Sequence, residues 1–258
     1  GNGSLFHGTP MIYTYDGTFF GFLSAVFDAW HIGLDHVEDI KIMGSTFLFG
    51  EERNVYTDEK KAQRILTALQ TKCGGKTCHV LYYAFLAEQP DRGMKLLRYI
   101  RQAFHLKDEF ISHLSDEEIW EVRKWAQKTG NERHKLLGLI RFQELSGGML
   151  YSRINPTCCV VPVMAPHFVR RLPGEEWVIH DIRRHMGIWY EGGVLSIIEI
   201  PRPLQQIDVS DEEAAFTALW KKYYQTIAIG ERSNEGLRRR FMPKKYWPYI
   251  VEMRNEKK

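Results

Sequence analysis

Basic, aromatic and histidine side chains recur between His134 and Arg184, within a sequence that is otherwise largely apolar. Guanidinium groups bind phosphate, imidazole transfers protons near neutral pH, and aromatic rings stack on flat bases. This combination indicates a site that faces nucleic acid. The residue types alone do not establish a reaction.

Arginine and lysine side chains are the candidate phosphate ligands. Contacts of this kind position a nucleic-acid backbone without reading its sequence. The cations at the end of the chain could instead belong to a solvated tail, and we interpret the aromatic residues among them as anchors of a last helix. The candidate nucleic-acid-binding residues are Arg141, Arg170, Arg171, Arg183, Arg184, Arg238, Arg239, Lys244 and Lys245.

A catalytic site is the second possibility. His167 is the candidate general acid or base, Asp181 would orient it, and Arg184 would hold a substrate phosphate. The simpler alternatives are that His167 is a surface or core histidine, and that Asp181 and Arg184 form an ion pair at a turn. Whether the protein is an enzyme therefore stays open.

A zinc site is a weaker possibility. Cys73, Cys78 and His79 offer two thiolates and an imidazole, but Cys158 and Cys159 are adjacent and make a poor second pair of ligands. We expect no metal and no cofactor. The sequence has no P-loop, GxGxxG, GxSxG or CxxxCxxC motif, which argues against nucleotide hydrolysis, dinucleotide redox chemistry, α/β-hydrolase chemistry and a radical-SAM cluster.

Composition favours a soluble protein of a reducing compartment. The longest apolar run, Cys158 to Ala165, is far shorter than the roughly 20 residues of a membrane span. Four cysteines are too few for a disulfide framework, so we expect a cytoplasmic protein. The net charge of +3 is too small to imply nucleic acid by itself. We interpret residues 1–10 as a cloning remnant, with Met11 as the native start.

The elements that position these side chains change type along the chain. Apolar periodicity and capping residues predict helices over 18–30, from Thr57 or Asp58 to before Cys73, and over 79–87, 91–104, 115–130 and 160–172. Alternating and β-prone runs predict strands over 11–15, 40–49, 136–145, 149–154, 177–182, 187–190 and 194–200. A capping box at Ser210 and a proline at Pro243 predict the closing helices.

These elements predict an α+β fold. It has a helical N-terminal half, a central antiparallel sheet of about five strands with a packed helix, and a helical C-terminus. We expect a single domain over 11–258, with possible subdomains over 11–130, mainly helical, and over 131–258, a sheet plus the C-terminal helices.

Several long motifs carry a resemblance to a known family. They include Tyr15-Asp-Gly-Thr-Phe-Phe-Gly-Phe-Leu-Ser-Ala-Val-Phe-Asp28, Pro166-His-Phe-Val-Arg-Arg-Leu172, Leu219-Trp-x-x-Tyr-Tyr224 and Met242-Pro-Lys-Lys-Tyr-Trp247. Over essentially residues 11–252, the chain resembles the bacterial "probable DNA metabolism protein" family, which is built on a domain of unknown function. One departure is Asn155-Pro-Thr-Cys-Cys159, where related sequences tend to place an acidic or polar residue, a proline and then a histidine.

The resemblance implies a context and no reaction. The family is typically encoded beside a radical-SAM DNA repair or modification protein, and a related domain is fused to uracil-DNA-glycosylase-like domains. Our first hypothesis is therefore an accessory DNA-binding factor that acts with the radical-SAM enzyme in DNA repair or modification. The alternatives are an enzyme acting on a nucleobase or nucleotide through His167, and a structural adaptor that docks the partner enzyme without touching DNA.

Overall fold

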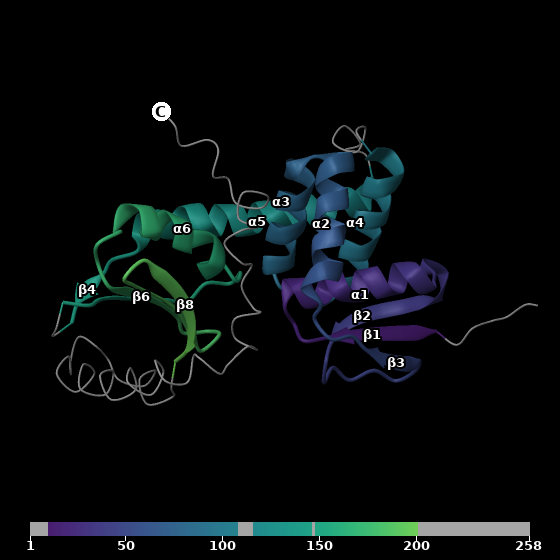
Figure 1. Ribbon diagram of the computed structural model, residues 1–258, viewed down its shortest axis with the longest axis horizontal. Coiled ribbons are helices and arrows are strands. Elements are labelled where there is room, and N and C mark those ends of the chain that lie inside the picture. The colour runs from purple at the N-terminus through teal and green to yellow at the C-terminus, as the bar shows by residue number, and fades with distance from the viewer. Residues whose placement is uncertain (1–9, 108–115, 146–147, 201–258) are drawn as a thin grey trace, which may run out of the picture. The chain divides into compact units, whose positions relative to one another are not determined.

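The computed structural model describes residues 10–107, 116–145 and 148–200 (Figure 1). These residues belong to two compact units. Unit 1 comprises the described residues up to Ala126, and unit 2 comprises those from Gln127 onward. Each unit has its own sheet, so each is described by itself. The closing helices predicted after Ser210 and Pro243 lie outside the described residues. So do residues 1–9, which are nearly all of the segment interpreted as a cloning remnant.

The helices and strands of unit 1 precede those of unit 2 along the chain. Unit 1 contains β1 (Met11–Tyr15), α1 (Phe19–Ile32), the 3-10 helix η1 (Leu34–His36), β2 (Val37–Ile42), β3 (Glu51–Asn54), α2 (Glu59–Cys73), α3 (Gly75–Leu86) and α4 (Arg92–Leu106). Helix α5 (Glu117–Leu139) begins in unit 1 and ends in unit 2. Unit 2 continues with β4 (Gln143–Glu144), β5 (Leu150–Ile154), α6 (Val161–Arg171), β6 (Trp177–Asp181), β7 (Met186–Glu191) and β8 (Val194–Glu199).

Unit 1 contains a three-stranded parallel sheet that the sequence analysis did not predict. Its order is β2-β1-β3, and β1 pairs in parallel with both neighbours. The single strand predicted over 40–49 is wrong, because β2 ends at Ile42 and β3 begins only at Glu51. All four side chains of β3 are exposed, so this strand has no apolar alternation from which it could be predicted.

A network of short polar side chains fixes the start of α1, which was predicted to begin at Thr18. The Thr18 hydroxyl accepts a hydrogen bond from the Gly21 amide at 2.9 Å, which confirms the cap. Asp16 accepts from the Thr18 amide and hydroxyl, and its second oxygen accepts from Thr57 at 2.6 Å. The turn between β1 and α1 is thereby tied to the segment that precedes α2.

Helices α1 to α4 form most of the helical part of unit 1, to which η1 and the first part of α5 also belong (Figure 1). Helix α1 lies against the sheet, and α2 packs against both α1 and α3. The core holds a cluster of aromatic rings in which Phe85 contacts Tyr15, Phe19 and Phe22. Buried Arg92 joins this cluster because its guanidinium lies 3.9 Å from the Phe85 ring centroid and donates to the Phe85 carbonyl.

Unit 2 contains the predicted five-stranded sheet, in the order β4-β5-β6-β7-β8, and α6 packs on one of its faces (Figure 1). The α+β class and the packed helix are confirmed. The sheet is mixed, however, because β5 and β6 pair in parallel while the other pairs are antiparallel. Helix α6 is the crossover between β5 and β6, and a crossover returns the chain in the same direction.

Helix α5 is longer than predicted. The predicted end at Gly130 and the strand predicted over 136–145 are both wrong, since the helix continues to Leu139 and only Gln143–Glu144 is strand. Tertiary contacts override the helix-breaking glycine. The Glu132 carboxylate accepts from the Thr157 amide, and Arg133 donates to the Val163 carbonyl, so this part of α5 is held by neighbouring segments. In the part of the chain that the structure describes, no helix has the length and apolarity needed to cross a membrane.

Candidate functional site

Asp181 and Arg184 form a buried ion pair at the turn between β6 and β7. The Asp181 side chain is fully buried at the end of β6, and its Oδ2 lies 2.8 Å from an Arg184 guanidinium nitrogen. Its Oδ1 accepts from the Arg184 backbone amide at 3.1 Å. Burial raises the pKa of Asp181, and Arg184 together with the turn amides offsets part of that increase. The pair therefore holds the turn together.

The Arg184 guanidinium also binds the backbone of the loop before α6. It donates to the Pro156 carbonyl at 3.2 Å and to the Thr157 carbonyl at 2.8 Å. From the opposite side, the two oxygens of Glu132 accept from the Thr157 and Cys158 amides, each at 2.7 Å. We call this arrangement the loop clamp. The guanidinium that the sequence assigns to phosphate is thus occupied by protein atoms.

Glu132 is a member of the loop clamp that the sequence analysis missed. Partial burial raises the pKa of its carboxyl group, but hydrogen bonds from the Cys158 and Thr157 amides outweigh burial and hold the pKa below its usual value. The sequence carries no signal for this role, because Glu132 follows Gly130, where the helix was predicted to end. Only the length of α5 brings it to the loop.

His167 lies on α6 and is partly exposed. Its ring meets the Phe168 ring edge to face, with centroids 5.1 Å apart. The hydrogen bonds of Asp181 to Arg184 and to the turn amides give this carboxylate a structural role, and its predicted role in orienting His167 stays a prediction. A catalytic role for His167 stays a prediction.

Among the described residues, the arginines of unit 2 that were predicted to bind phosphate divide into two groups. Phe142 contacts Phe168 at 5.3 Å between ring centroids, which brings the segment after α5 to the C-terminal part of α6. Arg141, Arg170 and Arg171 therefore lie toward that end, and all three are exposed. The turn that carries Arg183 and Arg184 instead contacts the loop before α6 through the hydrogen bonds of Arg184. The two ends of α6 are about 15 Å apart, at 1.5 Å per helical residue, so the two groups of arginines are separated by about that distance. Arg238, Arg239, Lys244 and Lys245 lie outside the described residues.

The cysteines considered for zinc belong to the core of unit 1. The Cys73 thiol donates to the Ala103 carbonyl, and the Cys78 thiol points to the Leu66 carbonyl. Burial raises the pKa of Cys78 to about 12, which disfavours the thiolate that a metal would need. His79 stacks on Tyr83 with ring centroids 4.1 Å apart. Among the described residues, no group of three or more metal-binding side chains converges.

His180 is a fully buried histidine of β6. Its Nδ1 lies 2.6 Å from the Tyr151 hydroxyl, which belongs to the neighbouring strand β5. Its Nε2 is buried without a hydrogen-bond partner. Burial, reinforced by the positive charges of Arg153 and His185, lowers the pKa of His180 to about 3. The imidazole is therefore neutral in the folded protein at physiological pH.

The buried neutral imidazole of His180 predicts a loss of stability in acid. An unfolded histidine takes up its proton near pH 6.5, whereas folded His180 does so only near pH 3, so the unfolded state binds more protons between these values. We expect this residue to cost about 2 to 3 kcal/mol of unfolding free energy between pH 7 and pH 4.5. Urea unfolding over a pH series measures it. The control is His180→Leu with Tyr151→Phe, and parallel pH curves for both proteins would contradict the prediction.

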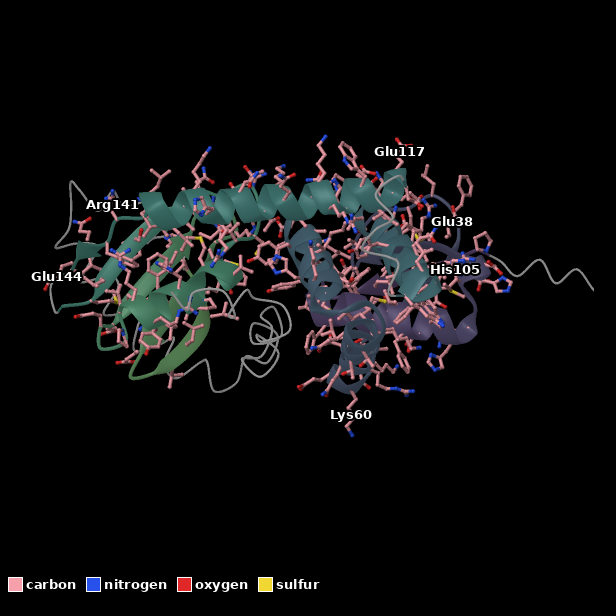
Figure 2. All side chains as sticks on the ribbon, turned by 90° about the horizontal axis from the view of Figure 1, so that it is seen from above. Glu38, Lys60, His105, Glu117, Arg141 and Glu144 are labelled. Carbon is pink, nitrogen blue, oxygen red and sulfur yellow. The ribbon has the colours of Figure 1, made fainter. Side chains whose placement is uncertain are left out.

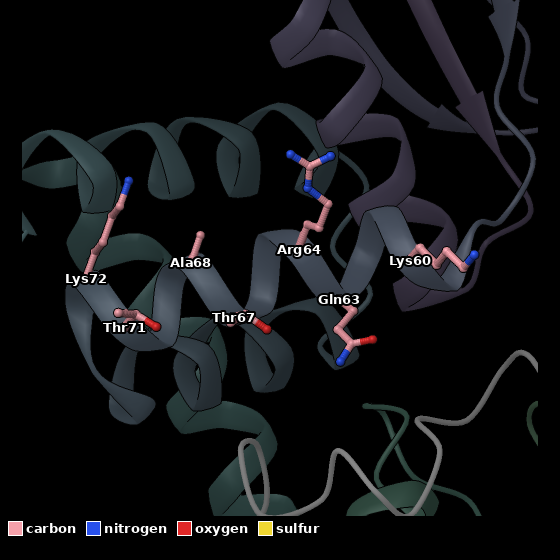
Figure 3. A pocket seen from close by; sticks show the side chains of 7 residues that line it. All are labelled: Lys60, Gln63, Arg64, Thr67, Ala68, Thr71 and Lys72. Carbon is pink, nitrogen blue, oxygen red and sulfur yellow. The ribbon is translucent and has the colours of Figure 1, made fainter.

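The exposed face of α2 carries cations that the sequence analysis did not consider. Figure 3 shows Arg64, Ala68 and Lys72 in one row along the helix, and Gln63, Thr67 and Thr71 in the neighbouring row. Lys60 projects outward at the start of the helix (Figure 2). These side chains line a shallow groove of about 540 Å³. We call six of them the α2 stripe: Lys60, Gln63, Arg64, Thr67, Thr71 and Lys72.

Two cations of the α2 stripe, Arg64 and Lys72, lie over aromatic rings. The Arg64 guanidinium lies 5.0 Å from the Phe27 ring centroid, and the Lys72 ammonium lies 5.5 Å from the Phe104 ring centroid. In the described part of the chain, neither these two nor Lys60 forms an ion pair with a carboxylate. The neighbouring Lys61, in contrast, pairs with Asp28 at 2.7 Å. The stripe therefore keeps its positive charge.

The signal for the α2 stripe was present in the sequence. The apolar residues Ala62, Ile65, Leu66 and Leu69 recur at helical spacing and form the buried face of α2, and the opposite face of the same helical wheel carries the stripe. The only acidic residue of α2, Glu59, lies in the first turn, where a carboxylate favours the helix dipole. These cations can therefore be predicted from the sequence as the solvent-exposed face of the amphipathic helix.

Comparison with known proteins gives a family and no described activity. The model of the family described as a domain of unknown function, DUF4130, matches residues 90–252, which is more than half of the chain. The matched residues include α4, α5 and the described part of unit 2, whereas the α2 stripe precedes them. A comparison with curated proteins finds no match.

Proposed function

We propose that this chain, which belongs to the DUF4130 family of domains of unknown function, binds nucleic acid through phosphate contacts made by the α2 stripe. The observation that carries the proposal is the absence of carboxylate partners for Lys60, Arg64 and Lys72 within the described residues. Cations that are already paired contribute little to binding an outside anion, whereas these three stay available.

The shape of the α2 stripe supports a polymeric ligand. Lys60 and Lys72 are twelve residues apart, which corresponds to about 18 Å along a helix. Arg64 lies between them, so three cations follow one line rather than converging on one point. Thr67 and Thr71 place hydroxyl donors beside this line. A row of this length can follow successive phosphates, whereas a single small anion would use only part of it.

Unit 2 offers additional proposed contacts. Arg141, Arg170, Arg171 and Arg183 are exposed and stay proposed ligands of the backbone. Arg184 is left out, because its guanidinium is bound in the loop clamp. The family resemblance described above supports DNA as the nucleic acid, and a radical-SAM repair or modification enzyme as the protein partner in the same process.

The proposal predicts salt-dependent binding to oligonucleotides. Fluorescence anisotropy with a labelled single-stranded oligonucleotide, and with its duplex, should show binding that weakens steeply as salt rises. Replacing Lys60, Arg64 and Lys72 together by glutamate should raise the dissociation constant at least about tenfold and reduce the slope of log affinity against log salt by about 2.

The control for this prediction is Arg53→Glu. Arg53 is an exposed arginine of unit 1 on β3, outside the α2 stripe, and the substitution matches the change at Arg64. The control should bind with almost the wild-type salt dependence. Absence of binding at low salt would overturn the proposal and leave the docking of a partner protein as the remaining role. Equal losses in the stripe variant and the control would show that net charge alone is responsible.

A further inference from the structure

A second hollow in unit 1 combines cations with aromatic rings. It measures about 610 Å³ and is lined by residues of α1, α4 and the first turn of α5. This volume lies in the range of sites for small molecules, which is roughly 300 to 1,000 Å³. Its charged and aromatic side chains are Trp30, Arg98, Arg101, Phe104, His105 and Glu118.

The polar side chains of the hollow favour an anion. Glu118 is its one carboxylate, and it is neutralised by Arg98 at 2.9 Å. Arg101 forms no ion pair within the described residues, so one guanidinium keeps its full charge. The pairing with Glu118 uses only part of the five N–H donors of Arg98 and fixes the direction of the others. Two guanidinium groups on adjacent turns of α4 can thus donate to one phosphate.

The aromatic side chains of the hollow favour a flat ring beside that anion. Trp30 and Phe104 meet edge to face, with centroids 5.3 Å apart and planes inclined by 80°. Trp30 is partly exposed, so its indole is open to a ligand in the hollow. His105 adds a third ring to the hollow at the surface of unit 1 (Figure 2). Stacking on such rings binds bases with little dependence on their sequence.

The hollow adjoins the α2 stripe at the contact between Lys72 and Phe104. Lys72, the last cation of the stripe, lies over the Phe104 ring, and Phe104 lines the hollow. All of the lining residues except Trp30 belong to the part of the chain that the family model matches. A strand that follows α2 would therefore reach the hollow at the Lys72 end of the helix.

We infer that this hollow binds one nucleoside monophosphate unit, with its base against Trp30 and its phosphate between Arg98 and Arg101. The unit is either a free nucleotide or the end of a single strand held by the α2 stripe, and the second source rests on the proposed function. The hollow adds stacking and a fixed phosphate position to the backbone contacts. It makes the protein prefer an unpaired nucleotide to one stacked in a duplex.

Calorimetric titration of the full chain with deoxyadenosine monophosphate tests the inference. Deoxyadenosine lacks the phosphate and inorganic phosphate lacks the base, so each should bind at least tenfold more weakly than the nucleotide. Arg101→Ala should raise the dissociation constant of the nucleotide at least tenfold. Arg53→Ala, the same substitution at an exposed site on β3, should leave it unchanged. Both arginines are exposed, so neither variant should lose its fold.

A second arm separates the two sources of the ligand. A single-stranded oligonucleotide with 2-aminopurine at its end reports stacking by loss of fluorescence, and Trp30→Leu should restore the fluorescence. If the oligonucleotide binds but the nucleotide does not, and Arg101→Ala has no effect, the inference is overturned and the proposed function stays intact. Nucleotide binding without oligonucleotide binding would support the hollow and overturn the α2 proposal. Equal binding of nucleotide, nucleoside and phosphate would overturn the pocket.

Discussion

Arg184→Ala is expected to lower the unfolding free energy of the protein by about 3 to 5 kcal/mol. The substitution leaves the fully buried Asp181 carboxylate without its counter-ion. It also removes the donors to the Pro156 and Thr157 carbonyls, while the hydrogen bonds from the loop amides to Glu132 remain. Arg184→Lys should be intermediate, since one ammonium cannot match the geometry of a planar guanidinium.

The adjacent Arg183 supplies the control for this prediction. It is exposed, and Arg183→Ala should change the unfolding free energy by less than about 0.5 kcal/mol. Urea unfolding followed by circular dichroism measures all three variants. Equal stabilities of the Arg183 and Arg184 variants would show that the loop clamp does not stabilise unit 2. A loss of nucleic-acid binding in Arg184→Ala should follow its loss of folded protein, because its guanidinium is occupied by protein atoms.

Gly93→Ala is expected to destabilise unit 1 by about 3 kcal/mol. Gly93 lies in the first turn of α4, which packs against β2, and a Cβ there would overlap the Ile40 carbonyl oxygen. The obstacle is backbone rather than the end of a flexible side chain, so α4 would have to move away from the sheet. That movement would also disturb Arg92, whose guanidinium packs on Phe85.

The control for this helix position is another helical glycine. A Cβ at Gly138 in α5 meets no atom within 4 Å, so Gly138→Ala should stabilise the protein by roughly 0.5 to 1 kcal/mol through helix propensity. Thermal unfolding of the two variants measures the contrast. An unchanged melting temperature in Gly93→Ala would contradict the close approach of α4 to β2.

Local signals were sufficient to predict the elements that have caps and an apolar face. Thr18 begins α1 as expected, and Asp58 begins α2 by accepting from the Lys60 and Lys61 amides. The buried stripe of α2 also follows from its 3.6-residue period. These features depend on residues close together in the sequence, which is why the sequence alone reveals them.

The features that sequence reasoning missed depend on contacts between distant segments. The extension of α5 beyond Gly130 depends on Glu132 reaching the loop before α6. The parallel pairing of β5 and β6 depends on the direction of a crossover, which alternation within each strand does not encode. β3 depends entirely on its pairing with β1, since its side chains are polar and exposed.

The α2 stripe and the hollow beside α4 lie outside the segments in which phosphate ligands were predicted. Arginines near aromatic residues were expected between His134 and Arg184 and at the end of the chain, and further groups of this kind occur on α2 and α4. For Arg184, both a phosphate ligand and an ion pair with Asp181 at a turn were predicted, because both roles require a guanidinium, and the ion pair is the one that the structure contains. Residue type cannot separate these roles. The accessibility of the guanidinium and the identity of the atoms around it can.

The charged side chains of β3 affect the tendency of the protein to self-associate at high concentration. Within the sheet as described, β3 pairs with β1 on one side only, and the nearby Leu48 and Phe49 are largely exposed. A border strand next to apolar side chains invites other molecules to add strands and form fibrils. Glu51, Glu52 and Arg53 oppose this, since stacking identical copies would place like charges in register. The short polar strand thus protects unit 1 against self-association.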